Sequence, residues 1–184
     1  MDERMRIDVV SEPDVPPAVD AAILRLQQRA FPNTEIFQRT RHYKHVARAG
    51  DFRVLAWLDD VPVGQVVVMW ANARTAAGET LRLAGLGNVC SDPDRRHTHA
   101  ASACMERALE LARQQRGDGS LLFCGARLES FYARFGYAIV RNEVFFTHPD
   151  GTVFRRDDHD IRMGLMLNDR PWPQGDLHLD TEDF

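Results

Sequence analysis

The hydrophobic positions near the start of the chain predict a strand followed by an amphipathic helix. Residues Arg6–Val10 form a short strand candidate, and the prolines up to Pro17 suit a helix entry, because the first helical turn needs no amide donor. Apolar residues then recur at helical spacing over Val19–Ala30 until Pro32 ends the pattern. The stretch Arg39–Ala49 suggests a second, irregular helix.

The middle of the chain is patterned for strands. Phe52–Leu58 and Val63–Trp70 are rich in β-branched and aromatic residues, and the turn chemistry of residues 59–62 between them predicts a hairpin. We expect a loop over Ala71–Thr80 and a further strand over Leu81–Cys90.

The second half alternates helices and strands. The expected elements are a helix over Ala101–Ala112, a strand over Ser120–Cys124, a short helix over Leu128–Phe135 with Gly136 as its left-handed cap, and a strand over Tyr137–Val140. A hairpin then joins Glu143–Thr147 to Thr152–Arg156 through a His-Pro-Asp-Gly turn. This alternation predicts an α/β or α+β fold around a mixed sheet.

Length and composition narrow the class of protein. The chain has 184 residues, 44% of them hydrophobic, which suits one domain over residues 1–184, with 157–184 expected as a C-terminal strand and extended arm. A net charge of −4 argues against nucleic-acid binding. The apolar run Val63–Trp70 is too short to cross a bilayer, and the first residues lack a secretory h-region, so we expect no membrane partner. Three cysteines without C-x-x-C spacing favour a reducing, cytoplasmic location.

The most informative stretch is the junction Asn88–Ala101, where a strand turns directly into a helix. Such a junction directs unpaired backbone amides and the positive end of the helix dipole at one point, which attracts a phosphate or diphosphate. Strand-to-helix turns are common in α/β proteins, so geometry alone leaves this assignment open.

The sequence from about Phe52 to Val140 resembles the GCN5-related N-acetyltransferase (GNAT) superfamily. The resemblance rests on Val89-Cys-Ser-Asp-Pro93-Asp-Arg-Arg96-His-Thr-His99-Ala-Ala101, on the strand Leu121–Cys124, and on Ser130-Phe131-Tyr132 followed by Gly136-Tyr137. It implies a mixed, mostly antiparallel sheet that splays after its fourth strand and is flanked by helices. It also implies an enzyme that moves an acetyl group from acetyl-CoA to a primary amine of a small molecule by direct transfer, and a homodimer is possible.

The resemblance assigns site residues by position. Backbone groups of Val89, Cys90 and Ser91 would contact the pantetheine arm of acetyl-CoA. The diphosphate loop would consist of Arg96, His97, Thr98, His99, Ala100 and Ala101. Tyr132 would protonate the departing thiolate, as a general acid.

Two histidines depart from the family pattern. His99 stands where the family has its first glycine, and His97 stands at a position that is often glycine; glycine lets the backbone approach phosphate closely. The imidazoles would either add a cationic donor or crowd the diphosphate. The alternative function is therefore a non-catalytic GNAT-fold protein, for ligand binding or assembly, with a degenerate loop.

Other roles stay open on sequence alone. Tyr132 could simply be part of an aromatic core with its neighbours. His97 and His99 lack a third ligand at suitable spacing, so we expect no metal. The strand before the junction carries no carboxylate to serve as general base; Glu35, His42, Asp51 and the carboxylates of the tail are all candidates.

The end of the chain carries a second, finer resemblance. The segment Asp150–Phe154 and the ending Asp169-Arg-Pro-Trp172-Pro-Gln-Gly175-Asp-Leu are similar to the C-terminal part of aminoglycoside 2′-N-acetyltransferases and their bacterial relatives. The acyl acceptor does not follow from this, because such tails also suit acetyltransferases that act on other small amines.

Overall fold

The computed structural model describes residues 5–41, 46–156 and 160–184, which adopt a mixed α/β fold with a mostly antiparallel sheet flanked by helices. The chain divides into two compact units: unit 1 comprises residues 1–69 and 87–109, and unit 2 comprises 70–86 and 110–184. Three elements continue from one unit into the other: β3 (Val61–Thr75), β4 (Thr80–Ser91) and α2 (Ala100–Gln114). The predicted fold class is confirmed.

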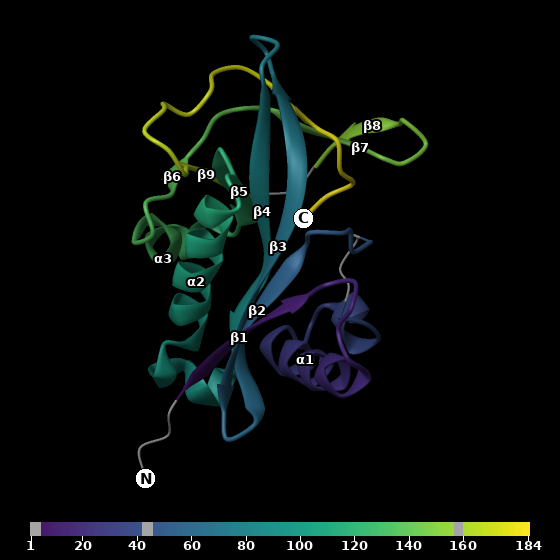
Figure 1. Cartoon of the computed structure of the whole chain (residues 1–184), viewed down its shortest axis with the longest axis vertical. Helices are drawn as coiled ribbons and strands as arrows, with labels where there is room; N and C mark the ends of the chain where they lie inside the picture. Colours follow the sequence, from purple (N-terminus) through teal and green to yellow (C-terminus); the bar gives the residue numbers. More distant parts are fainter. Residues whose placement is uncertain (1–4, 42–45, 157–159) are drawn as a thin grey trace. The chain divides into compact units, whose positions relative to one another are not determined.

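Unit 1 is built on an antiparallel ladder of β1 (Arg6–Ser11), β2 (Phe52–Leu58) and the first part of β3. Helix α1 (Pro17–Ala30) packs its apolar face on this ladder, burying Ile23 with Leu55 and Trp57 (Figure 1). Asp59 and Asp60 both have left-handed backbones, with φ of 47° and 62°, which suits a tight hairpin turn. The predicted first strand, first helix and hairpin are all confirmed.

The expected second helix is wrong at its described residues. Residues 39–41 and 46–49 are not helical, and 42–45, including the candidate base His42, lie outside the described residues. A short 3₁₀ turn, η1 (Glu35–Gln38), lies just before this stretch instead. Arg41 is buried in ion pairs with Glu12 and Asp20, so part of the charge that suggested a solvated helix face serves long-range contacts.

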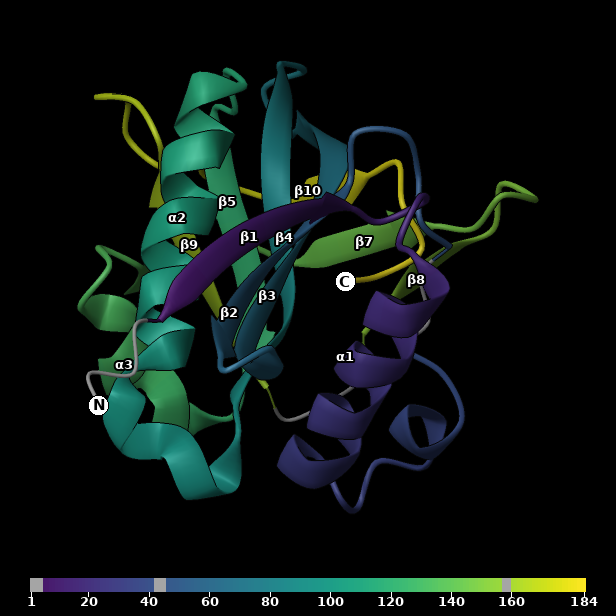
Figure 2. The same cartoon turned by 60° about the horizontal axis from the view of Figure 1, so that its bottom comes forward.

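Unit 2 holds strands in the order β6-β9-β5-β4-β3-β10-β7-β8. The bounds of those not yet given are β5 Gly119–Cys124, β6 Ala138–Ile139, β7 Val144–Thr147, β8 Val153–Arg155, β9 Ile161–Met166 and β10 Leu177–Leu179. β4 pairs in parallel with β5, and β10 pairs in parallel with β7; all four strands are labelled in Figure 2. The β4–β5 register runs from Leu83 opposite Gly119 to Leu86 opposite Leu122, whereas β4 itself continues to Ser91.

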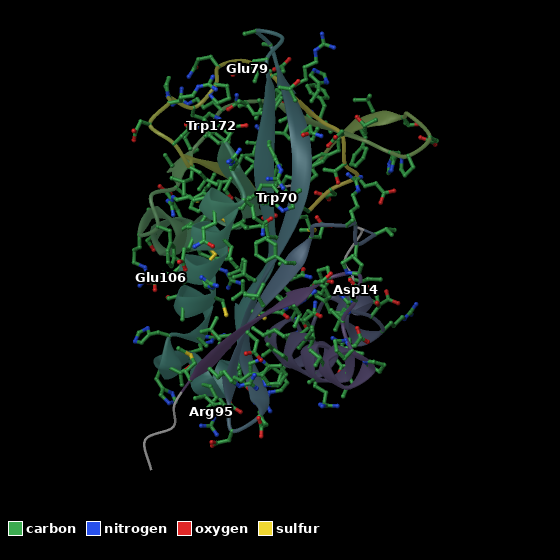
Figure 3. All side chains as sticks on the ribbon, in the orientation of Figure 1. Asp14, Trp70, Glu79, Arg95, Glu106 and Trp172 are labelled. Atoms are coloured by element: carbon green, nitrogen blue, oxygen red, sulfur yellow. The ribbon has the colours of Figure 1, made fainter. Side chains whose placement is uncertain are left out.

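The loop expected at Ala71–Thr80 is shorter than predicted, because β3 runs on to Thr75. Its last residues, Ala73–Thr75, pair with Leu177–Leu179 of β10, about a hundred residues later in the sequence, which local pattern cannot reveal. Glu79 marks the tip of the resulting β3–β4 hairpin in Figure 3 and pairs with Arg170 at 2.6 Å.

The C-terminal segment lies over one face of the unit 2 sheet. Gly85, Leu121 and Gly164 are directly paired across β4, β5 and β9, so they share a face. A Cβ on Gly85 would lie 2.4 Å from the ring of Phe184, and one on Gly164 would lie 2.8 Å from the indole of Trp172. Both glycines therefore make room for large aromatic side chains of the segment that follows β9.

The short helix expected over Leu128–Phe135 is present but shorter, and a 3₁₀ turn precedes it. η3 (Ala126–Leu128) leads into α3 (Glu129–Ala133), and Gly136 has a φ of 92°, as predicted for a left-handed cap. Within the described part of the chain, no helix has the length and apolar character needed to cross a membrane.

Helix α2 begins in close contact with β3. A Cβ on Gly64 would lie 2.7 Å from the Cβ and 2.9 Å from the carbonyl carbon of Ala100, closer than real side chains approach. A glycine inside an apolar strand pattern is a known sign of such an approach. The contact fixes where α2 starts relative to β3.

We predict that Gly64→Ala destabilises the fold by about 1–3 kcal/mol, since backbone and helix must both shift to admit the methyl group. Gly125→Ala is the matched control, because no atom lies within 4 Å of its added Cβ and its φ of −61° suits alanine. Urea unfolding of both variants measures the difference. Equal stability of the two would show that Gly64 is not tightly packed.

Candidate active site

The junction between β4 and α2 is a short, tightly tied turn in unit 1. Strand β4 ends at Ser91, η2 (Pro93–Thr98) follows, and α2 begins at Ala100. Asp92 ties the turn at both ends: its amide donates to the carbonyl of Val63 at 2.8 Å, and its carboxylate accepts from the amide of Asp94 at 3.0 Å. An aspartate before a proline is a typical start signal for such a turn.

Arg29 of α1 anchors this turn from outside the motif. Its guanidinium donates to the carboxylate of Asp92 at 2.9 Å and to that of Asp94 at 2.6 Å. The attraction of Asp92 raises the pKa of Arg29, and the ion pair offsets both acidic charges next to the junction. Sequence analysis missed this residue, because no local signal links a helix end to a turn more than sixty residues away.

His99 takes the backbone conformation that glycine would favour. Its φ is 57° and its ψ is 24°, in the left-handed region, and it lies directly before the first residue of α2. Its amide donates to the carbonyl of Arg96 at 3.3 Å. Histidine is among the residues that tolerate this conformation better than most. The departure from the family pattern therefore keeps the shape of the turn while adding an exposed imidazole.

The junction combines a helix N-terminus with exposed basic side chains. The first turn of α2 starts with small residues, Ala100 and Ala101, so the helix N-terminus carries little side-chain bulk. Arg96 and His97 are exposed, and Arg96 forms no ion pair with any residue that the structure describes; Figure 3 shows the neighbouring Arg95 on this loop. Amides at a helix N-terminus next to the guanidinium of Arg96 suit a phosphate.

The last residues of β4 are partly accessible and irregular. Val89 and Ser91 are half-buried, whereas Cys90 is buried. Just before them, Asn88 has a φ of 51°, a left-handed conformation inside a strand. Strand β4 therefore changes direction where the pantetheine contacts are expected.

The three cysteines are poor nucleophiles. Burial raises the pKa of Cys90 and of Cys104 to about 12, and that of Cys124 to about 11. Their thiols stay protonated near neutral pH, and only thiolates react readily. An acyl-enzyme formed on cysteine is not supported.

Tyr132 lies in unit 2, within an aromatic cluster at α3. Its side chain is buried, with 5% exposed, and its ring meets that of Phe131 edge-on at 5.0 Å and that of Tyr137 at 6.1 Å. The Tyr137 hydroxyl is 2.6 Å from that of Ser120, and burial raises the pKa of Tyr137. The aromatic side chains around Tyr132, the candidate acid, thus form part of the core, as the alternative interpretation expected. The junction residues 89–101 lie in unit 1.

Several candidate bases are already engaged in structural contacts. Glu35 is exposed beside Arg39, and Asp51 is buried with its carboxylate accepting from the amide of Arg48 at 2.9 Å. In the tail, Asp180 binds the amide and side chain of Asn72, and Asp183 is buried 3.5 Å from Arg156. Among the described residues, no group of three or more metal-ligating side chains occurs.

Unit 2 also contains a cavity of about 410 Å³ between β6 and the segment around Trp172. The buried side chain of Asn142 shapes this cavity. Its Oδ1 accepts from the Trp172 indole at 2.8 Å, and its Nδ2 donates to the main-chain carbonyl of Pro173 at 2.9 Å. Glu143 and Asp176 place carboxylates in its wall. The cavity wall thus combines an aromatic ring with charges of both signs, because Arg141 also lines it and Glu143 pairs with Arg155 at 2.9 Å.

Comparison with known proteins identifies the family and agrees with the fold. Residues 20–140 match the family model described as an acetyltransferase (GNAT) domain. Among curated proteins, no sequence matches significantly. Similar solved structures include the GNAT family acetyltransferase YhbS from Escherichia coli in complex with CoA, with a TM-score of 0.65, 17% identity, and coverage of 96% of this chain and 90% of that one.

Two further structures are similar over nearly their whole length. A GNAT family acetyltransferase from Brucella melitensis in complex with acetyl-CoA has a TM-score of 0.61 and 19% identity, covering 95% of both chains. An acyl-CoA N-acyltransferase from Pseudomonas aeruginosa has a TM-score of 0.60 and 19% identity, covering 88% of this chain and 99% of that one. The chain belongs to the GNAT acetyltransferase family, and it is an N-acetyltransferase of that type.

The left-handed backbone of His99 leads to a stability prediction. We expect His99→Val to destabilise the fold by about 1–2 kcal/mol, because a β-branched side chain clashes in this conformation. His97→Val is the control: His97 is also exposed, but it is absent from the described non-glycine residues with positive φ, so its replacement should change stability by less than about 0.5 kcal/mol. Urea unfolding at constant pH compares them, and two equal effects would contradict a conformational role for His99.

Proposed function

We propose that the enzyme transfers an acetyl group from acetyl-CoA directly to a primary amine of a small molecule. The observation that carries the proposal is the turn from β4 into α2, in a chain that belongs to an acetyltransferase family. This turn offers helix amides and the positive charge of Arg96, while His99 has the left-handed conformation that glycine favours. Two similar structures hold CoA or acetyl-CoA, which supports the choice of donor.

The residues fit the diphosphate of CoA by chemistry and by space. Ala100 and Ala101 add little side-chain bulk at the start of α2, and the exposed side chains of Arg96, His97 and His99 lie just before it in the sequence. Val89, Cys90 and Ser91 would offer backbone groups to the pantetheine arm. Acetyl-CoA supplies the activated thioester, and the protein's part is to hold it and to manage one proton.

In the proposed reaction, the amine nitrogen bonds to the acetyl carbon, the carbon–sulfur bond breaks, and the electron pair goes to sulfur. Tyr132 would donate its phenolic proton to that sulfur, because a thiol is a better leaving group than a thiolate. The amine must also lose a proton, through a carboxylate or through water. The protonated state of all three cysteines supports direct transfer over an acyl-enzyme.

The acceptor class rests on the resemblance to acetyltransferases that act on small amines. In the cavity beside Trp172, the carboxylate of Asp176 could meet an ammonium group, whereas Glu143 pairs with Arg155 and Arg162, and Arg141 also lines the wall. The finer resemblance to aminoglycoside 2′-N-acetyltransferases stays a prediction. A panel of small amines, aminoglycosides included, assayed with acetyl-CoA and a thiol reagent tests it, and the buried protein thiols should contribute little background.

The alternative is a non-catalytic protein whose loop no longer suits CoA. The preserved turn geometry at His99 argues against such decay. Isothermal titration with acetyl-CoA that shows only heat of dilution, together with no turnover on any amine, would favour this alternative, and turnover on at least one amine would exclude it.

Tyr132→Phe tests the proposed mechanism. The change removes one oxygen and keeps the ring, so packing and acetyl-CoA affinity should change little, while turnover should fall by roughly 10²-fold if proton donation limits the rate. Tyr137→Phe is the matched control: it removes the hydroxyl that meets Ser120, so it should lower stability by about 1 kcal/mol and leave turnover nearly unchanged. Wild-type turnover in Tyr132→Phe would remove this residue from the mechanism.

A further inference from the structure

A chain of buried polar side chains crosses unit 1 and ends at the bend in β4. Glu12, at the end of the first strand segment, binds two guanidinium groups, those of Arg41 and Arg53. Arg53 also donates to the side-chain carbonyl of Gln65 at 2.6 Å. Gln65 in turn donates its amide to the main-chain carbonyl of Asn88 at 3.1 Å.

This chain lies almost wholly out of solvent. Gln65 is 0% exposed, Arg53 1% and Glu12 2%. Burial lowers the pKa of Arg53, although the neighbouring Glu12 carboxylate opposes that shift. Buried ion pairs often contribute less stability than apolar residues of the same volume would, and one role they can have is to select a single geometry. The role of these buried side chains therefore depends on which group they hold in place.

The chain ends at the one described position inside β4 where the backbone leaves the extended conformation. Asn88 has a φ of 51°, and side chains in this region are disfavoured unless their surroundings hold them. Its carbonyl is the group that Gln65 binds. A left-handed residue redirects the peptides that follow it, and these belong to Val89–Ser91.

We propose that Gln65 is a positioning residue for acetyl-CoA: with Arg53 and Glu12 behind it, it fixes the bend at Asn88 and so sets the direction of the backbone groups of Val89–Ser91. This inference rests on the proposed function, in which those groups contact the pantetheine arm. The turn at residues 92–101 has its own supports, namely Arg29 and the contact of Gly64 with Ala100. Gln65 therefore acts on the arm of the donor and not on its nucleotide end.

Gln65→Leu removes the hydrogen bonds to Arg53 and Asn88, and the side-chain hydrogen bond with Cys90, at nearly constant volume. Isothermal titration should show acetyl-CoA binding weakened by about 10-fold, the usual effect of leaving one buried polar contact unmade, with unchanged binding of adenosine 3′,5′-bisphosphate, which lacks the arm. Gln28→Leu is the matched control. Gln28 also donates its amide to a main-chain carbonyl, that of Gln38, but away from β4, so neither affinity should change.

A second variant separates the bonds of Gln65 to Arg53 and to Asn88. In Gln65→Glu the carboxylate still accepts from Arg53 but cannot donate to Asn88, so it should weaken acetyl-CoA binding as Gln65→Leu does while keeping more of the stability. It also decides the matter if Gln65→Leu fails to fold. Unchanged acetyl-CoA affinity, or equal weakening of both ligands, would overturn the role of Gln65. A wild-type protein that binds no acetyl-CoA would instead overturn the proposed function itself, and this inference with it.

Discussion

The close contact between β3 and the first residue of α2 is the constraint on which the candidate site of unit 1 depends. Only a glycine at position 64 lets the helix begin this near the strand, and the bond from the Asp92 amide to the Val63 carbonyl holds the preceding turn to the same strand. Because the two contacts are neighbours on β3, they fix both the end of β4 and the start of α2. The helix amides and the loop therefore form one rigid turn, as an anion site requires.

Ion pairs around this turn neutralise its acidic side chains. The acidic side chains of Asp92 and Asp94 shape the backbone, and Arg29 of α1 forms ion pairs with both. Because Arg29 neutralises these carboxylates, Arg96 does not pair with them. The buried side chains of Glu12, Arg53 and Gln65 are hydrogen-bonded in sequence, and the last of them binds the carbonyl at the bend in β4. Helix α1 and the first strands thus support the candidate site through Arg29, Arg53 and Gln65.

The elements with strong local patterns could be predicted from sequence, and those defined by distant partners could not. The helix over residues 17–30 and the hairpin at Asp59-Asp60 follow from apolar spacing and turn chemistry. The extension of β3 to Thr75 depends on β10, and the ion pairs of Arg41 replaced an expected helix face with buried contacts. In the candidate site, the motif predicted the turn but not Arg29, Gln65 or the bend at Asn88, and the role of Tyr132 stays a prediction. Those three become visible only when segments far apart in the sequence are brought together.

The claim at the centre of this account is that the turn from β4 into α2 receives the diphosphate of CoA. The most direct measurement is isothermal titration of CoA into the wild-type protein and into Ala101→Trp, with unfolding curves recorded for both. We predict saturable binding by the wild type and a loss of about 10-fold or more in affinity in the variant at similar stability, because the indole would occupy the space where backbone and phosphate meet. Equal affinity of the two proteins for CoA would contradict the claim and place the binding site elsewhere.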